Sequence, residues 1–186
     1  EAYFGKIVIS LNLGNCDEMK PADKKKIRKL CLAHKAIDAK FIDPACVVVA
    51  YWTRYKCQYG CGAYGKSLCC PPNAPSPDET RQILSEYNSA LLVRFGSKVK
   101  VTGAIAALER DVFLMDFYKA IGFGAGPCRL CKECNLQECA FPKLARPSME
   151  ACGIDVYATA RNSGFPLHVL TSQEAHQNRY GLLLIE

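Results

Sequence analysis

The chain has 186 residues, of which 49% are hydrophobic, and a formal net charge of +6. This length and composition predict a single domain over residues 1–186 with an ordinary core, so disulfides are not needed to stabilise it. No apolar run approaches the ~20 residues that cross a bilayer, which excludes a membrane span. The net charge of +6 is only a weak signal for nucleic-acid binding, so nucleic acid is not expected as a partner.

Before the first cysteine-rich segment, the sequence predicts a strand, a helix and a second strand. Residues 6–13 predict the first strand. Residues 22–39 predict a helix with an apolar face that includes Ile27 and Cys31. The β-branched and aromatic residues of 46–52 predict the second strand.

After that segment, strands and helices continue to alternate. Ser76-Pro77-Asp78-Glu79 is a capping box with proline at the first helical position, and the helix runs to about Asn88. The remaining expected elements are a strand at 90–95, a helix at 104–121, a helical stretch at 148–163 interrupted at Gly153, and strands at 167–171 and 180–185. We therefore expect an α/β (or α+β) fold. A single sheet is flanked by helices, with two cysteine-rich loops at about 57–72 and 122–152.

The second of these loops carries the most informative motif. It is C-x2-C-x2-C-x4-C, formed by Cys128, Cys131, Cys134 and Cys139. The bacterial ferredoxin run is C-x2-C-x2-C-x3-C-P, so the motif here is close to it but one residue longer in its last gap. The first three cysteines can hold three irons of a cubane, and the fourth iron can take Cys139 or a more distant cysteine.

A second cysteine group precedes Pro71-Pro72 and consists of Cys57, Cys61, Cys69 and Cys70. About 57 residues without cysteine separate the two groups, which predicts two metal centres or the two halves of one. Adjacent cysteines do not suit an ordinary disulfide, so metal thiolates are favoured. Zinc prefers C-x2-C pairs set well apart, whereas three cysteines at consecutive spacings of three favour iron–sulfur.

The remaining cysteines divide into two kinds. Cys16, Cys31 and Cys46 are isolated and predict small core residues. Cys152 follows the second loop and is either a further ligand, completing the first group if Cys69 is not a ligand, or a buried core residue.

Three polar residues beside the cysteines are candidates for binding a cofactor or substrate. Tyr64 and Lys66 lie within the first group, and Arg146 lies near the second. A cation there can offset cluster charge or bind an anion. Each residue can equally be structural, for example by pairing with Glu109 or Glu150.

The basic run from Lys24 to Lys29 also has two interpretations. It is either a solvated helix face or a docking site for an acidic redox partner.

These segments together resemble a family of predicted metal-binding proteins, domain of unknown function 2284. The resemblance covers nearly all the chain after about residue 40. It rests on the stretches Cys57 to Pro72, Tyr118 to Ala120, Gly126 to Cys134 and Ala145 to Val156, with Glu109. In that family pattern the cysteine before Pro-Pro is the motif cysteine, which favours Cys70 over Cys69 as a ligand. The resemblance implies a small soluble protein of anaerobic archaea and bacteria that carries iron–sulfur clusters.

The leading hypothesis is a cytoplasmic protein with two [4Fe–4S] clusters that transfers electrons to a redox partner in anaerobic metabolism. No signal peptide is visible in residues 1–13. The alternatives are an iron–sulfur enzyme whose open iron acts on a small molecule, and a zinc-stabilised interaction module. The predicted metal ligands are Cys57, Cys61, Cys70, Cys128, Cys131, Cys134, Cys139 and Cys152.

Overall fold

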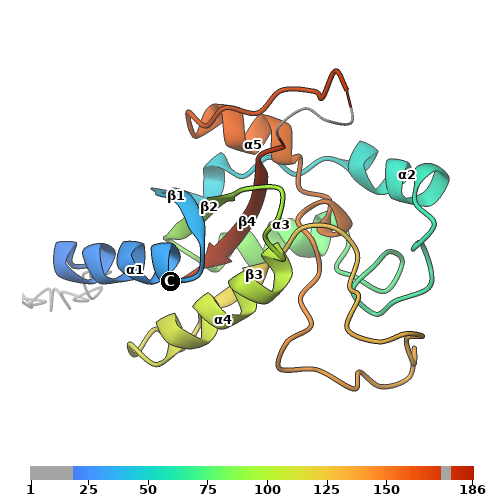
Figure 1. The fold of residues 1–186 in the computed structure, drawn as a ribbon, viewed down its shortest axis with the longest axis horizontal. Helices are drawn as coiled ribbons and strands as arrows, with labels where there is room; N and C mark the ends of the chain where they lie inside the picture. The colour runs from blue at the N-terminus through green and yellow to red at the C-terminus, as the bar shows by residue number, and fades with distance from the viewer. Residues whose placement is uncertain (1–18, 173–176) are drawn as a thin grey trace, which may run out of the picture.

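A four-stranded antiparallel sheet forms the centre of the protein (Figure 1). The structure, a computed structural model, describes residues 19–172 and 177–186, so the predicted strand at 6–13 and Cys16 lie outside the described residues. The strands have the order β1-β2-β4-β3 and are β1 (Ala36–Ile42), β2 (Ala90–Phe95), β3 (Ile121–Phe123) and β4 (Arg179–Leu184). Every pairing is antiparallel, which makes the fold α+β.

Helices connect these strands. They are α1 (Pro21–Ala33), α2 (Tyr51–Gly60), α3 (Pro77–Ser85), α4 (Val101–Phe113) and α5 (Val156–Asn162), with short 3-10 helices η1 (Pro44–Cys46) and η2 (Glu150–Cys152). No helix in the described ranges has the length and apolar character needed to cross a membrane.

Side chains alternate between the two faces along the central strands of the sheet. Each face packs against its own hydrophobic core, so these strands are buried on both sides. Leu91 and Val93 of β2 pack with α1 and α4 in one core. Ala90 and Leu92 point to the other face and pack with α3, α5 and η2. Strand β2 therefore has a nearly continuous apolar sequence, which is why it was predictable.

Several predicted elements are confirmed. Ser76 and Glu79 form the capping box at the start of α3. Strands β2 and β4 lie within a residue of their predicted positions. The stretch from 148 to 163 is interrupted at Gly153, where a φ of 85° places the backbone in the left-handed region between η2 and α5.

The prediction of one helix over 22–39 was wrong beyond Ala33. Helix α1 ends there, and Lys35 has a φ of 68°, so the chain reverses into β1. The residues of β1 pair with β2 along its length, and this tertiary pairing overrides the local helical pattern.

The predicted strand at 46–52 was also wrong. Pro44 begins η1, and only Val49 forms a bridge, to Ile154, before α2 starts at Tyr51. The segment runs along the turn at Gly153, where Ala50 donates to the Gly153 carbonyl at 2.8 Å, and finds no longer strand to pair with.

Two further elements differ from the prediction, one helix and one strand. Helix α4 ends at Phe113 rather than near 121, because the chain turns at Asp116, whose φ is 79°, and enters β3. Residues 167–171 form no strand. They follow Pro166, whose carbonyl accepts from the Tyr180 hydroxyl at 2.7 Å.

Helix α4 approaches the sheet closely because two strand positions carry glycine. A Cβ at Gly181 would lie 2.5 Å from Ile105 Cγ1, and a Cβ at Gly122 would lie 2.3 Å from Ile105 Cγ2. The Ile105 side chain thus occupies the space that strand side chains would otherwise fill.

We predict that Gly181→Ala lowers the free energy of unfolding by about 1–3 kcal/mol, because the added methyl overpacks the contact with Ile105. Gly103→Ala is the matched control, since Gly103 lies in α4 and a Cβ added there would have nothing within 4 Å. That control should leave stability unchanged or raise it by up to about 1 kcal/mol. Urea unfolding of both variants measures the difference, and equal effects would contradict the close approach.

Candidate metal centre

The two cysteine groups lie at the end of the molecule remote from α1 (Figure 1). The first group begins within α2 and not in a loop as predicted. Cys57 lies in the last turn of this helix, and Cys61 caps it by donating its backbone N–H to the Cys57 carbonyl at 3.2 Å. Residues four apart at the end of a helix lie on the same side, so these two thiols can serve one site.

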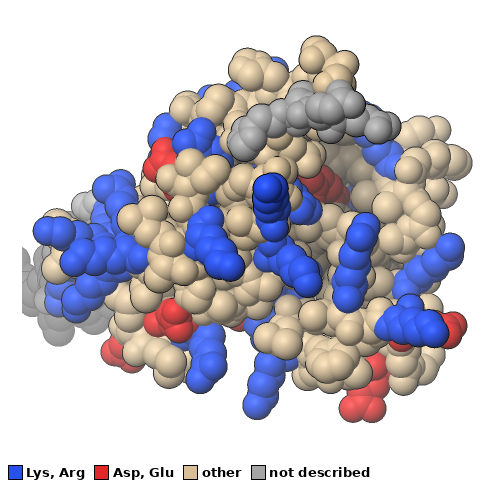
Figure 2. All heavy atoms as spheres, viewed as in Figure 1, with Lys and Arg blue, Asp and Glu red and all other residues tan. Residues whose placement is uncertain are grey.

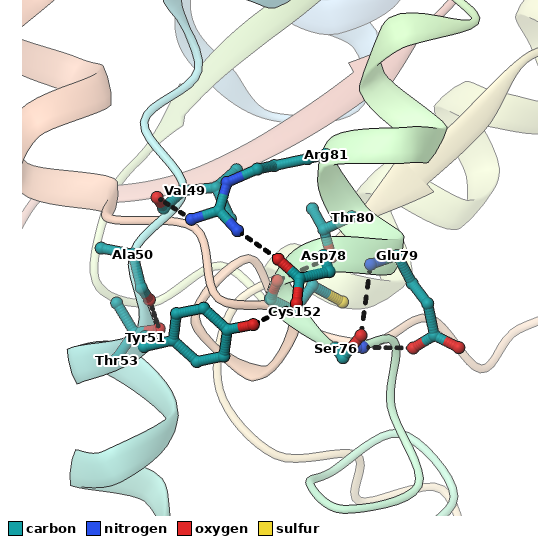
Figure 3. A network of polar contacts seen from close by, with 10 residues as sticks. All are labelled: Val49, Ala50, Tyr51, Thr53, Ser76, Asp78, Glu79, Thr80, Arg81 and Cys152. Carbon is teal, nitrogen blue, oxygen red and sulfur yellow. Dashed lines mark hydrogen bonds and ion pairs between the residues drawn. The ribbon is translucent and has the colours of Figure 1, made fainter.

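The start of α2 is fixed against α3 by a polar network (Figure 3). The Tyr51 hydroxyl donates to Asp78, and Arg81 donates to Asp78 Oδ1 at 2.7 Å and to the Val49 carbonyl at 3.0 Å. The Thr80 hydroxyl donates to the Cys152 carbonyl at 2.7 Å, which joins η2 to the same network. Helix α2, and Cys57 with it, therefore has a defined position relative to Cys152.

Arg54 holds the segment that contains the other half of this group. Its guanidinium donates to the carbonyls of Pro72, Ala74 and Pro75 at 3.4, 3.1 and 2.7 Å. These carbonyls follow Cys69-Cys70 and the Pro71-Pro72 pair, whose peptide bond is cis. One side chain of α2 thus keeps Cys69 and Cys70 beside the helix that carries Cys57.

The second group lies on segment 125–147, which contains no helix or strand. Its two ends are joined, because Gly124 donates to the Pro147 carbonyl at 2.8 Å and accepts from Met149 at 3.0 Å. Long segments without regular structure are uncommon in compact proteins and usually serve a function.

Arg146 anchors the end of this segment to α4. It forms a two-point ion pair with Glu109, with 2.6 Å between Arg146 Nε and Glu109 Oε2. Glu109 Oε2 also accepts from the Gly122 backbone N–H at 2.8 Å. The hydrogen bond to Glu109 is the main reason that the pKa of Arg146 is raised, and the pair matches the structural alternative for this residue.

Thiols of the two groups meet at Cys69 and Cys128. Burial, followed by the neighbouring Cys128 thiol, raises the pKa of Cys69 to about 12, and Cys139 contributes further. Burial raises the pKa of Cys70 as well, while the Cys128 backbone amide opposes that rise. The two groups therefore form one cysteine-rich region. The sequence did not indicate that Cys69 belongs with the second group.

Cys57 and Cys61 of the first group are neighbours of Cys70. Burial raises the pKa of Cys57, and the thiols of Cys61 and Cys70 and the Glu150 carboxyl add to the rise. Burial raises the pKa of Cys152 to about 12, with Cys69 and Glu150 among its neighbours. Cys152 is fully buried in the apolar core, so it fits the core interpretation and also lies within reach of the cysteine region.

A hollow of about 460 Å³ separates the two segments. Cys128, Cys131 and Cys134 line one side, and glycines of the first segment line the other together with Lys66. Burial raises the pKa of Cys131, and the thiols of Cys134, Cys128 and Cys139 add to the rise. Tyr64 instead lines a groove beside the aromatic side chains of α2.

Within residues 19–172 and 177–186, no three cysteine, histidine, aspartate or glutamate side chains converge tightly enough to hold one metal ion as they stand. The thiols are instead distributed around the hollow and along the contact between Cys69 and Cys128. This arrangement differs from a closed tetrahedral site, in which four ligands surround one ion at about 2.3 Å.

The two isolated cysteines among the described residues, Cys31 and Cys46, differ in burial. Cys31 is buried between α1 and the sheet, as predicted, and burial raises its pKa to about 12. Cys46 is exposed, so its prediction as a core residue was wrong. It lies in η1, where Pro44 is the buried residue and the cysteine side chain turns outward.

Basic side chains gather over α1 (Figure 2), where Lys25, Lys26, Arg28 and Lys29 are exposed. Because α1 and the cysteine region lie at opposite ends of the molecule, a partner bound to this helix would not approach the thiols. The arrangement favours the interpretation of this run as a solvated face.

A comparison with protein families matches residues 40–185 to a family described as "Predicted metal-binding protein (DUF2284)". The chain belongs to this family. The match includes both cysteine groups and Cys152, and the family description supports metal binding without specifying the metal. No curated protein and no solved structure gives a significant match to the chain.

We predict that Glu109→Gln lowers the free energy of unfolding by about 2 kcal/mol, because Arg146 and the Gly122 amide lose a charged partner. Lys26→Gln is the control, since its pair with Asp23 is 3.7 Å long and its side chain is 69% exposed. Removing that pair should cost under about 1 kcal/mol. Denaturant unfolding compares the two variants, and a similar small loss in both would argue against Arg146–Glu109 as an anchor.

Proposed function

We propose that this protein binds two [4Fe–4S] clusters and transfers single electrons in anaerobic metabolism. The observation that carries the proposal is the contact between Cys69-Cys70 and Cys128, which brings together two cysteine groups far apart in the sequence. Clusters held by these groups would be neighbours, and neighbouring clusters can pass electrons one at a time.

The two proposed ligand sets follow the two groups. Cys128, Cys131, Cys134 and Cys139 would hold one cluster. Cys57, Cys61 and Cys70, with Cys152 or Cys69, would hold the other. A bound [4Fe–4S] cluster supplies a one-electron redox couple, whose potential depends on hydrogen bonds, charge and exposure at the thiolates.

The residues present fit a [4Fe–4S] cluster in two respects. The donor set consists of thiols, which iron–sulfur clusters require, and burial raises the pKa of Cys69 and of Cys131, so the protein by itself disfavours these two thiolates. Bound metal cations would reverse that preference by supplying positive charge.

The second respect in which the protein fits a cluster is the character of segment 125–147. Large apolar side chains are exposed along it, at Leu130, Leu136, Phe141 and Leu144. A segment with so little core of its own gains order when its cysteines bind a common inorganic centre.

Charged and polar side chains around the hollow suit an anionic cluster and an acidic partner. Lys66 and Lys132 line it together with Glu133, so two cations face one acid. Lys66 would offset cluster charge and present a basic rim to a redox partner protein. Arg146 would act through the position of its segment, and Tyr64 through the groove that it lines beside the aromatic side chains of α2.

A cytoplasmic location is part of the proposal. The eleven cysteines among the described residues are all free thiols. Free thiols persist in a reducing compartment, whereas secreted proteins of this cysteine content usually form disulfides.

A second candidate function is an iron–sulfur enzyme with an open iron. Cys152 is packed in the apolar core and Cys69 lies against Cys128, which favours only three ligands for the first cluster, namely Cys57, Cys61 and Cys70. An iron without a protein ligand can bind a small molecule as a Lewis acid.

We expect the anaerobically purified protein to contain about eight irons and eight acid-labile sulfides per chain, as two cubanes require. Cys131→Ser should lose about half of the iron, and Cys46→Ser is the control because Cys46 is exposed and isolated. Iron, sulfide and zinc analysis measures this. One or two zincs without sulfide would overturn the proposal and leave a structural module.

The choice between the adjacent cysteines gives a separate prediction. Cys70→Ser should lose about half of the iron, whereas Cys69→Ser should retain it and alter the electron paramagnetic resonance signal of the neighbouring reduced cluster, because Cys69 contacts Cys128. The reverse pattern of iron loss would make Cys69 the ligand. If both variants keep full iron content, neither cysteine holds the first cluster.

A further inference from the structure

Helix α2 carries a set of exposed aromatic side chains at the end of the molecule that holds the cysteine segments (Figure 1). Tyr51, Trp52, Tyr55 and Tyr59 are between 44% and 69% exposed, and we call them the aromatic face. The rings of Tyr55 and Tyr59 lie with their centroids 4.6 Å apart. Single exposed apolar side chains are ordinary, whereas several large ones gathered on one surface mark an interaction site.

The aromatic face points away from the cysteine region across the width of the helix. A helix repeats every 3.6 residues, so the three tyrosines, spaced four apart, share one side with Trp52. Thr53 is buried on the opposite side, and Cys57 follows it one turn later. A helix with its side chains is about 10–12 Å across, so a partner on the aromatic face would lie about one helix diameter from the Cys57 thiol.

Hydrogen bonds hold the aromatic face in position. The Tyr51 hydroxyl donates to Asp78 of α3, and Arg54 donates to carbonyls of the segment that follows the first cysteine group. A groove of about 350 Å³ runs beside the face and is lined by Trp52, Tyr64 and neighbouring side chains. A surface that is already ordered loses less conformational entropy on binding, and a groove beside aromatic rings can accept a side chain of the partner.

The charge around the aromatic face is positive. All charged residues of the stretch 51–66 are basic, namely Arg54, Lys56 and Lys66. The Lys56 ammonium lies 5.1 Å from the centroid of the Trp52 ring, so this charge is part of the same surface. An acidic surface is therefore the electrostatic complement of the face.

Asp78 lies beside the aromatic face, but a cation balances its charge. Its Oδ1 accepts from Arg81 at 2.7 Å, and the Arg81 guanidinium lies 5.6 Å from the centroid of the Tyr51 ring. The surface thus combines tryptophan, tyrosine and arginine, which are the residues that contribute most of the binding energy at protein–protein interfaces.

Single-stranded nucleic acid also stacks on aromatic side chains, but it binds along a positively charged groove that follows its backbone. Among the described residues that line the groove beside α2, Arg54 is the cation, and its guanidinium already donates to the carbonyls of Ala74 and Pro75. The observations therefore favour a protein as the occupant.

We propose that the aromatic face is the docking surface for a small acidic protein that carries one electron. The proposal rests on the proposed function and identifies the partner's surface and charge. Trp52 and Tyr55 would form the central contacts, and Lys56 would attract the acidic surface. The docked partner would stand across α2 from Cys57 and next to Cys61, which is exposed at the end of the helix.

Binding of a negatively charged bacterial-type ferredoxin to the full chain, purified without oxygen, tests the proposal by fluorescence anisotropy of the labelled ferredoxin. Saturable binding is expected at about 50 mM NaCl and should weaken about tenfold or more at about 500 mM, because salt screens exposed charges. A single-stranded oligothymidine is the competing probe. No saturable ferredoxin binding at low salt, or tighter binding of the oligothymidine, would overturn the proposal.

Variants locate the binding on the aromatic face. Trp52→Ala and Tyr55→Ala should each weaken ferredoxin binding about tenfold, and Lys56→Glu should weaken it at low salt. Tyr118→Ala and Lys25→Glu are the matched controls and should bind as the unmodified chain does, because Tyr118 is exposed beyond the end of α4 and Lys25 is exposed on α1. Equal binding by all five variants, with folding checked by circular dichroism, would contradict the assignment.

A measurement on the unmodified chain decides the matter if a variant misfolds. Trp52 is the one tryptophan of the sequence, so its fluorescence reports on the aromatic face. A saturating ferredoxin that itself lacks tryptophan should reduce acrylamide quenching of this fluorescence about twofold, because the partner covers the ring. Unchanged quenching would place the ferredoxin elsewhere and overturn the proposal.

Iron and sulfide analysis of the same samples keeps the docking surface and the proposed function apart. Full iron content without ferredoxin binding would overturn the docking surface and leave the proposed clusters. Ferredoxin binding at α2 by a chain without iron or sulfide would support the docking surface and overturn the proposed clusters.

Discussion

The ion pair between Arg146 and Glu109 joins three parts of the chain on which the cysteine region depends. Glu109 belongs to α4, its Oε2 accepts from Gly122 of β3, and Arg146 closes segment 125–147. Charged hydrogen bonds of this kind are strong when partly shielded from water, and here the side chains are 18% and 13% exposed. The sheet edge, the helix and the cysteine segment are therefore placed together by one carboxylate.

The first cysteine group has a separate anchor in Arg54, which holds the segment after Cys70 to α2. The two anchors fix the ends of the segments, whereas the thiols meet chiefly at Cys69, Cys70 and Cys128. A frame that fixes segment ends and leaves the thiols to adjust is suited to a site that forms around an inorganic centre. Metal binding would then contribute directly to the stability of the region between the anchors.

The parts of the fold that could be predicted are those in which local signals decide the structure. The capping box at Ser76 starts α3 through contacts three residues apart, and the apolar run of β2 is buried on both faces. Strand β1 could not be predicted, because its residues become a strand only by pairing with β2. The same limit explains 46–52, where a strand-like composition finds only one bridge.

The candidate site shows a similar division. Cysteine spacing identified both groups, but it could not reveal that Cys69 lies against Cys128, since that contact joins residues far apart in sequence. The sequence also could not show that Cys46 is exposed, because this depends on η1, which buries Pro44 and turns the cysteine outward.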